Sequence, residues 1–254
     1  MIVRTLEELE VLGRVKYPAD RSFRSARFLT AADGMGFSYN ENKVAGGTNL
    51  VVWLKHHWEA NYIVSGRGQV ADLTSNESWP LAAGVLYVVG PNDRHRLHLT
   101  EDECHISIFR PPLTGDERFD EDGCYEASGP IEKTDRRMFV KSVDEMRRAG
   151  AEQVTADGRV RTVEMLGDAD RIGFGVSDLR LVAGAETMLG DSNSCQANHV
   201  LFGTGVATDI ASGDTRKLGS GMAFFAGAGD ELRVQARTDM HILSVFSQQP
   251  AGAG

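Results

Sequence analysis

The chain has 254 residues and a formal net charge of -9, with 41% hydrophobic and 25% charged residues. These values predict a soluble globular protein with two domains of about 125 residues each. An acidic chain without a basic stripe is unsuited to nucleic acid or anionic membranes, and no apolar run approaches the roughly 18 residues of a transmembrane helix, so neither partner is expected.

The N-terminal segment predicts a short helix, because Thr5 and Glu8 have the spacing of a capping box. Acidic residues this close to the start are atypical of a secretory signal peptide. We therefore expect a cytoplasmic protein, in which Cys104, Cys124 and Cys195 are reduced thiols.

Short runs of β-branched and aromatic residues, separated by Gly, Asn, Asp and Pro, predict strands along most of the first half. Ser65 to Gly68 predicts a tight hairpin turn, because glycine tolerates a positive φ angle. Many short strands at regular spacing are typical of a β-sandwich or barrel. The predicted strands are residues 51–54, 61–64, 68–73, 85–89 and 105–109.

The second half repeats the first with an offset of 137 residues, since residues 138–146 echo residues 1–9 and the turn glycines recur. One domain duplicated in tandem explains this repeat. We expect a first domain at 1–127, a linker at 128–137, a second domain at 138–247 and a disordered tail at 248–254.

Three polar residues of the first copy are lost from the second. They are Glu59, Tyr87 and His95, whose counterparts are Gln196, Phe224 and Leu232. Strand pairing across a small barrel can bring a carboxylate, a phenol and an imidazole into one cavity, where they form a donor set suited to Fe(II) or Zn(II). The sequence therefore predicts one divalent metal, in the first copy alone.

The first half also resembles the ectoine synthases, a family of small metal-dependent cupin enzymes, over residues 1 to about 126. The segments that carry the resemblance are Met1–Leu9, Asp33–Ser38, His57–Tyr62, Leu86–Tyr87, Asp93–His95, Phe109–Gly115 and Asp120–Gly123. The resemblance implies an all-β fold: a bicupin of two tandem double-stranded β-helix (jelly-roll) barrels with few helices, the second of them degenerate.

The resemblance further implies that Glu59, Tyr87 and His95 are the metal ligands and form the catalytic centre. It implies that His57 helps to position these ligands without binding the metal itself. It implies a substrate pocket lined by Arg27, Asn40 and Phe109. At other pocket positions this chain departs from the family, where Phe23 replaces Trp, Asn42 replaces Thr, Leu54 replaces Tyr, Ser107 replaces Cys and Phe119 replaces His.

The expected activity is that of a hydro-lyase, the metal-dependent cyclising dehydration of a small acylated diamino acid other than the standard ectoine precursor. One alternative is an Fe(II) cupin oxygenase, isomerase or lyase acting on a small amino-acid-like acid. Another is a non-catalytic cupin that binds a small molecule. The second copy is expected to form an intramolecular pseudo-dimer with the first, and the chain is a candidate homodimer.

Overall fold

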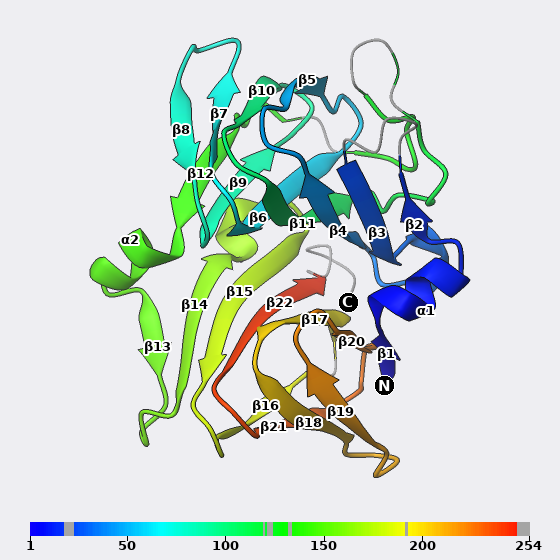
Figure 1. Ribbon diagram of the computed structural model, residues 1–254, viewed down its shortest axis with the longest axis vertical. Helices are drawn as coiled ribbons and strands as arrows, with labels where there is room; N and C mark the ends of the chain where they lie inside the picture. The colour runs from blue at the N-terminus through cyan, green and yellow to red at the C-terminus, as the bar shows by residue number, and fades with distance from the viewer. Residues whose placement is uncertain (18–22, 119, 121–123, 132–133, 191–192, 248–254) are drawn as a thin grey trace. The chain divides into compact units, whose positions relative to one another are not determined.

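The computed structural model describes residues 1–17, 23–118, 120, 124–131, 134–190 and 193–247. Phe119 and the predicted tail at 248–254 lie outside these residues. The regular structure of the described chain is mostly antiparallel β-strand, and the chain divides into two compact units, as Figure 1 shows. We call Leu9–Ser142 the first barrel, and Met1–Glu8 with the chain from Val143 onward the second barrel. The predicted pair of β-barrels is confirmed.

The first barrel consists of a seven-stranded sheet in the order β12-β9-β6-β11-β4-β3-β2 and a four-stranded sheet in the order β5-β10-β7-β8. Apolar side chains from both sheets form one core between them, which includes Ile63 and Val89 of the large sheet and Val70 and Leu97 of the small sheet. This is the sandwich expected of a double-stranded β-helix. The strands are β2 (Val15–Lys16), β3 (Phe23–Leu29), β4 (Ser38–Val44), β5 (Asn49–Trp53), β6 (Trp58–Ser65), β7 (Gly68–Asp72), β8 (Ser78–Leu81), β9 (Val85–Val89), β10 (Arg94–Leu99), β11 (Glu103–Arg110) and β12 (Phe139–Ser142).

The second barrel has the same topology, with sheets in the order β1-β20-β17-β22-β15-β14-β13 and β16-β21-β18-β19. Each strand occupies the position of the strand 137 residues away, so the sequence repeat is a structural repeat. The strands are β1 (Ile2–Arg4), β13 (Glu152–Val154), β14 (Val160–Leu166), β15 (Phe174–Leu181), β16 (Glu186–Leu189), β17 (Gln196–Phe202), β18 (Thr204–Asp209), β19 (Thr215–Gly219), β20 (Ala223–Ala226), β21 (Leu232–Ala236) and β22 (Met240–Ser247).

The first strand of each copy belongs to the other barrel. β1 pairs with β20 of the second barrel, and β12 pairs in the corresponding register with β9 of the first. The structural units therefore differ from the expected domain limits of 1–127 and 138–247. Backbone hydrogen bonds and buried side chains attach the first strand of each copy to the barrel formed by the other copy. Periodicity in one sequence cannot show which of two equivalent sheets a strand joins.

Local sequence signals predict the helices correctly and one turn incorrectly. The capping box is confirmed at α1 (Leu6–Val11), where the Thr5 amide donates to Glu8 Oε2 at 2.7 Å and the Glu8 amide donates to Thr5 Oγ1 at 3.2 Å. The repeated helix is α2 (Val143–Arg148). The hairpin expected at Ser65–Gly68 is wrong: Gly66 has a φ of 94°, but β6 and β7 belong to different sheets, so this turn carries the chain between sheets. No described helix is long and apolar enough to cross a membrane.

Candidate active site

A row of polar side chains crosses the inner face of the large sheet in the first barrel. Antiparallel register places its members side by side on adjacent strands, which are about 4.8 Å apart. The row runs Tyr87 (β9), Asn61 (β6), Ser107 (β11), Asn40 (β4) and Arg27 (β3). All five are buried, and they include four of the residues that the sequence assigned to the site.

Glu59 lies on the same inner face one step along β6, opposite Phe109 of β11. Removal from water raises the pKa of the Glu59 carboxyl, while the electrostatic interaction with His105 and hydrogen bonds to the side chains of Asn61 and Ser107 oppose that rise. The Asn61 amide nitrogen is buried and has no hydrogen-bonding partner among the described residues. The amide nitrogen of Asn61 and the carboxylate of Glu59 therefore lie on the same inner face, two residues apart on β6.

Tyr87 and His95 complete the predicted triad from two different sheets. Their ring centroids are 6.3 Å apart. Burial raises the pKa of Tyr87 well above its ordinary value, and the charges of Glu59 and Glu103 add to the rise. Burial also lowers the pKa of His95 to about 4. The neutral imidazole of His95 therefore lies beside a phenol whose ionisation is opposed by burial.

These three residues have the donor chemistry of a divalent-cation site, a carboxylate, a phenol and an imidazole. His95 Nδ1 lies 3.2 Å from the backbone oxygen of Asp93, so that nitrogen carries the proton and Nε2 has a lone pair that could bind a metal. Among the described residues no group of three or more His, Cys, Asp and Glu side chains is placed to hold a metal. A metal site formed by the predicted triad would therefore need the phenol oxygen of Tyr87 as its third donor.

The turn that precedes His95 is held by an arginine from the segment interpreted as a linker. Asp93 Oδ2 accepts from the Gly90 amide at 2.8 Å, and Arg137 Nε donates to Asp93 Oδ1 at 2.9 Å. Arg137 Nη2 also reaches both oxygens of Asp72, at 3.0 and 3.1 Å. Sequence reasoning missed Arg137, because nothing local indicates that the segment before β12 packs on the first barrel.

Arg27, the expected carboxylate clamp, is buried and already paired. Its Nη1 lies 3.0 Å from Glu117 Oε2, while its Nε has no hydrogen-bonding partner among the described residues. Glu117 also accepts from the amides of Thr114 and Gly115. Burial raises the pKa of Glu117, but these hydrogen bonds outweigh burial and the net pKa is lowered. Glu117 is a site residue that the sequence did not single out.

His57 is fully buried behind the row. Its Nε2 lies 2.9 Å from Ser128 Oγ, and its ring packs edge-on against Phe109 and Tyr125, with centroids 6.3 and 6.5 Å away. Burial lowers the pKa of His57 to about 4, so the ring is neutral at pH 7. These contacts position Phe109, which matches a supporting role better than direct ligation.

Two candidate pocket residues are not part of the polar row. Phe23 lines a cavity of about 430 Å³ with Arg24, Glu103 and Cys104, and no member of the triad lines that cavity. Leu54, at a departure from the family, belongs to the apolar core. Asn42 remains within the site, because its Nδ2 donates to Ser107 Oγ at 2.9 Å.

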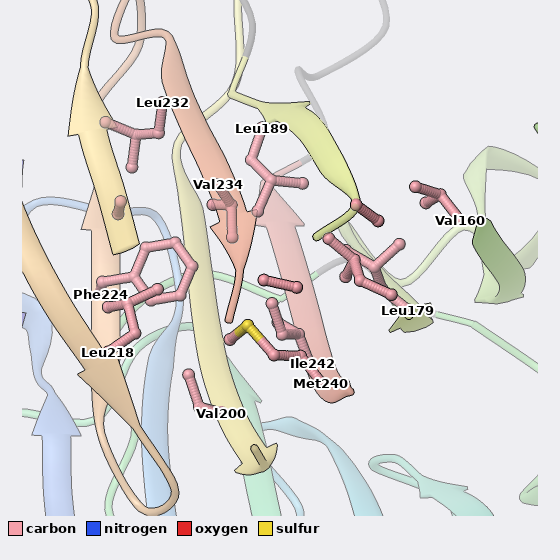
Figure 2. Close-up of a cluster of buried hydrophobic side chains, with 14 of the residues drawn as sticks. Val160, Leu179, Leu189, Val200, Leu218, Phe224, Leu232, Val234, Met240 and Ile242 are labelled. Atoms are coloured by element: carbon pink, nitrogen blue, oxygen red, sulfur yellow. The ribbon is translucent and has the colours of Figure 1, made fainter. Parts of the chain in front are cut away.

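The second barrel is filled where the first is polar. Phe224 and Leu232, the counterparts of Tyr87 and His95, are fully buried in a continuous apolar cluster that Figure 2 shows. Only the Asn–Ser pair of the row survives there, with Ser244 Oγ 2.7 Å from Asn198 Oδ1. At two of the three triad positions, a side chain that could bind a cation is thus replaced by an apolar side chain.

Comparison with known proteins gives a consistent result for both copies. The sequence profile of the ectoine synthase family matches residues 1–129 and again residues 138–254. The L-ectoine synthase of Desulfosudis oleivorans is 43% identical over 127 residues, which are 50% of this chain and 97% of that protein. The L-ectoine synthase of Wolinella succinogenes is 38% identical over 125 residues, which are 49% of this chain and 95% of that protein.

Solved structures resemble the chain along nearly its whole length. The Escherichia coli protein Ylba has a TM-score of 0.71 at 12% identity, over 98% of this chain and 91% of its own. A Bacillus subtilis oxalate decarboxylase described for its Mn(II) centres has a TM-score of 0.67 at 12% identity, over 99% of this chain and 78% of its own. At such identities these likenesses show a shared two-barrel fold.

Proposed function

The chain belongs to the ectoine synthase family, and from this premise we propose that its first barrel is a metal-dependent cyclase that dehydrates a small N-acylated diamino acid. The observation that carries the proposal is the set of the half-buried Glu59 and the buried Tyr87 and His95, against apolar packing at two of the three counterparts in the second barrel. A divalent ion, Fe(II) or Zn(II), would be held by these three residues and would polarise the amide carbonyl of the substrate as a Lewis acid.

The chain's own residues supply binding and orientation. Arg27 Nε and Asn40 Oδ1 are buried without hydrogen-bonding partners among the described residues, and both lie on the row beside the triad. Guanidinium donors suit a carboxylate, so Arg27 holds the acid end of the substrate while the acyl group reaches Glu59 and Tyr87. Holding the amine and the amide together removes the entropy of their encounter.

We further propose that the preferred substrate is not the standard ectoine precursor. Asn42 and Ser107 form a hydrogen-bonded pair beside the triad, at positions where the chain departs from the family. Leu54 removes a hydroxyl at a third position. Each polar substrate group left unpaired costs about 1–3 kcal/mol, so two or three losses reduce kcat/KM by roughly 10²–10⁴.

The test is a direct assay. Protein purified anaerobically and loaded with Fe(II) or Zn(II) is incubated with a panel of N-acyl diamino acids, and cyclised product and O₂ uptake are followed together. Cyclisation without O₂ uptake supports the proposal. O₂ uptake with an oxidised product, or no turnover of any N-acyl diamino acid in the panel, overturns the cyclase assignment. Turnover of the acetylated diaminobutyrate at the rate of an authentic ectoine synthase overturns the proposed change in substrate preference.

A further inference from the structure

A second polar cluster lies deeper in the first barrel, beyond Ser107 on the inner face of β11. Glu103 and His105 are both buried, and His105 Nδ1 lies 2.8 Å from Glu103 Oε1. On its other side, His105 Nε2 lies 3.2 Å from Asn42 Nδ2. Asn42 Nδ2 also donates to Ser107 Oγ, which donates to Asn61 Oδ1 at 2.5 Å. A continuous chain of contacts therefore runs from Glu103 to the polar row of the active site.

The partners of His105 select one form of its ring. An amide NH₂ can only donate, so His105 Nε2 accepts from Asn42 and Nδ1 carries the proton that Glu103 accepts. A neutral imidazole in this tautomer presents its basic nitrogen toward the side of the barrel that contains Ser107. Rotation of the Asn42 amide, which exchanges its NH₂ for its oxygen, would accommodate a proton on Nε2. The pair is thus arranged to hold a proton in either of two states.

The second barrel lacks this cluster. The counterparts of Glu103 and His105 are Met240 and Ile242, which are 2% and 0% exposed within its apolar core. The counterpart of Asn42 is Leu179, also in that core. The fold therefore does not need an acid and a histidine at these positions. They occur in the barrel that has the candidate ligands and are absent from the barrel that has lost them.

The cluster is close enough to the triad to act on it. Glu103 adds to the rise in the pKa of Tyr87, and His105 opposes the rise in the pKa of Glu59. His105 lies two residues from Ser107 on one strand, a separation of about 7 Å. A diamino acid of a few carbons spans that separation. Glu103 also lines the cavity of about 430 Å³ described above, which gives the pair a side that does not face the triad.

We propose that His105, oriented by Glu103 and Asn42, is the proton carrier of the cyclisation, a role that rests on the proposed function. The amine of a diamino acid is an ammonium at neutral pH and cannot attack until it loses a proton. His105 Nε2 takes that proton, and the free amine forms a C–N bond to the amide carbon as the carbonyl electron pair moves to oxygen.

The remaining steps balance without any other reactant. The attacking nitrogen passes a second proton to the oxygen, and His105 returns the first proton to the same oxygen. The C–O bond then breaks, water leaves, and the cyclic amidinium product keeps the positive charge of the ammonium. His105 ends the cycle neutral. Glu103 is a positioning residue, because it contacts the ring of His105 and not the substrate.

The test compares kcat and KM of metal-loaded wild type, His105→Gln and Glu103→Gln on the N-acyl diamino acid that wild type turns over fastest. General acid–base catalysis contributes about 10²–10⁴-fold, so His105→Gln should lose kcat by that factor with the metal content unchanged. The exposed His98→Gln is the matched control and should keep full activity. Because a variant at a buried position can unfold, the double variant Glu103→Met, His105→Ile reproduces a pair that the same fold already packs in the second barrel. It should fold, bind metal and lack activity.

The pH profile separates positioning from mere packing. Glu103 on β11 contacts His105, and the charge of Glu59 on β6 interacts with it, while the residue of β6 that pairs with it is Ile63 and β4 and β3 present the uncharged Asn42 and Ser25. Glu103→Gln removes the negative charge beside the proton carrier, so the acid limb of kcat/KM should move to lower pH. An unmoved acid limb, or a folded His105→Gln variant with wild-type kcat, overturns the role while leaving the cyclase intact. No turnover by wild type overturns the cyclase and this role with it.

Discussion

The buried Glu103–His105 pair allows a stability prediction that does not depend on any substrate. The two side chains are 0% and 8% exposed, and their contact is 2.8 Å. Breaking a buried pair by removing one partner costs about 3–5 kcal/mol, because the other charge stays buried alone. Replacing both partners by apolar residues of similar volume is neutral or stabilising by about 1–4 kcal/mol.

His105→Ile therefore leaves the Glu103 carboxylate without its partner and should lower the free energy of unfolding by about 3–5 kcal/mol. Glu103→Met leaves an unpaired imidazole N–H, which costs about 1–3 kcal/mol. The double variant should be at least as stable as wild type, since Met240 and Ile242 occupy the same register in the second barrel. The lower ends of the two ranges for the single variants, about 3 and about 1 kcal/mol, add to about 4 kcal/mol. The coupling energy between the two positions is then at least about 4 kcal/mol.

Urea unfolding followed by tryptophan fluorescence measures this directly. All three tryptophans, Trp53, Trp58 and Trp79, lie in the first barrel, so their emission reports on that unit alone. With an m-value of about 2 kcal/mol/M, the single change at His105 should lower the midpoint by about 2 M. A loss below about 1 kcal/mol for His105→Ile, or a double variant as unstable as the sum of the singles, would refute a buried and coupled pair.

Three further outcomes are expected. Elemental analysis of Fe(II)- or Zn(II)-loaded protein should give one metal per chain. Glu59→Ala should abolish this metal binding, and the matched control Gln196→Ala should keep it. Two equivalents of metal per chain would contradict a single site. In metal-free protein, burial lowers the pKa of His95 from an ordinary 6.5 to about 4. The free energy of unfolding should therefore fall by on the order of 3 kcal/mol as the pH is lowered from 6.5 toward 4. His95→Leu should flatten that part of the plot of urea midpoint against pH, and an unchanged slope would exclude His95 as its source. A fragment of residues 9–142 includes β12 and should unfold cooperatively. A fragment of residues 1–130 lacks β12 and should aggregate or lose the cooperative fluorescence transition. Equal behaviour of the two fragments would show that the exchanged strand adds little to the stability of the first barrel.

Much of the fold could be predicted from the sequence because its determinants are local. Alternating short strands, turn glycines and a repeat offset of 137 residues predict two similar β-barrels, and the strand orders of the two units agree with that repeat. The loss of Glu59, Tyr87 and His95 from the second copy pointed to a single polar site. Side-chain alternation along a strand has a period of two, so the sequence pattern alone identifies Asn40 and Asn42 as positions on the same face.

Other features could not be read from the sequence because they depend on contacts between distant segments. The sequence repeat does not show that β1 and β12 are exchanged between the barrels, since the hydrophobic pattern of each strand fits either sheet equally well. Arg137 became part of the site only because β12 brings it to Asp93 and Asp72. Glu117 is recognisable only from its contact with Arg27.

The sequence by itself determined the two barrels, the inward positions and the difference in polarity between the copies, because strand alternation and residue chemistry are properties of neighbouring residues. Only the tertiary structure decided that Glu103, His105 and Asn42 form one cluster with Ser107. These residues come from two strands that are separated by about 60 positions in the chain and meet through register. A hydrogen bond requires two atoms about 3 Å apart, and that proximity is set by strand pairing, which a single sequence does not specify.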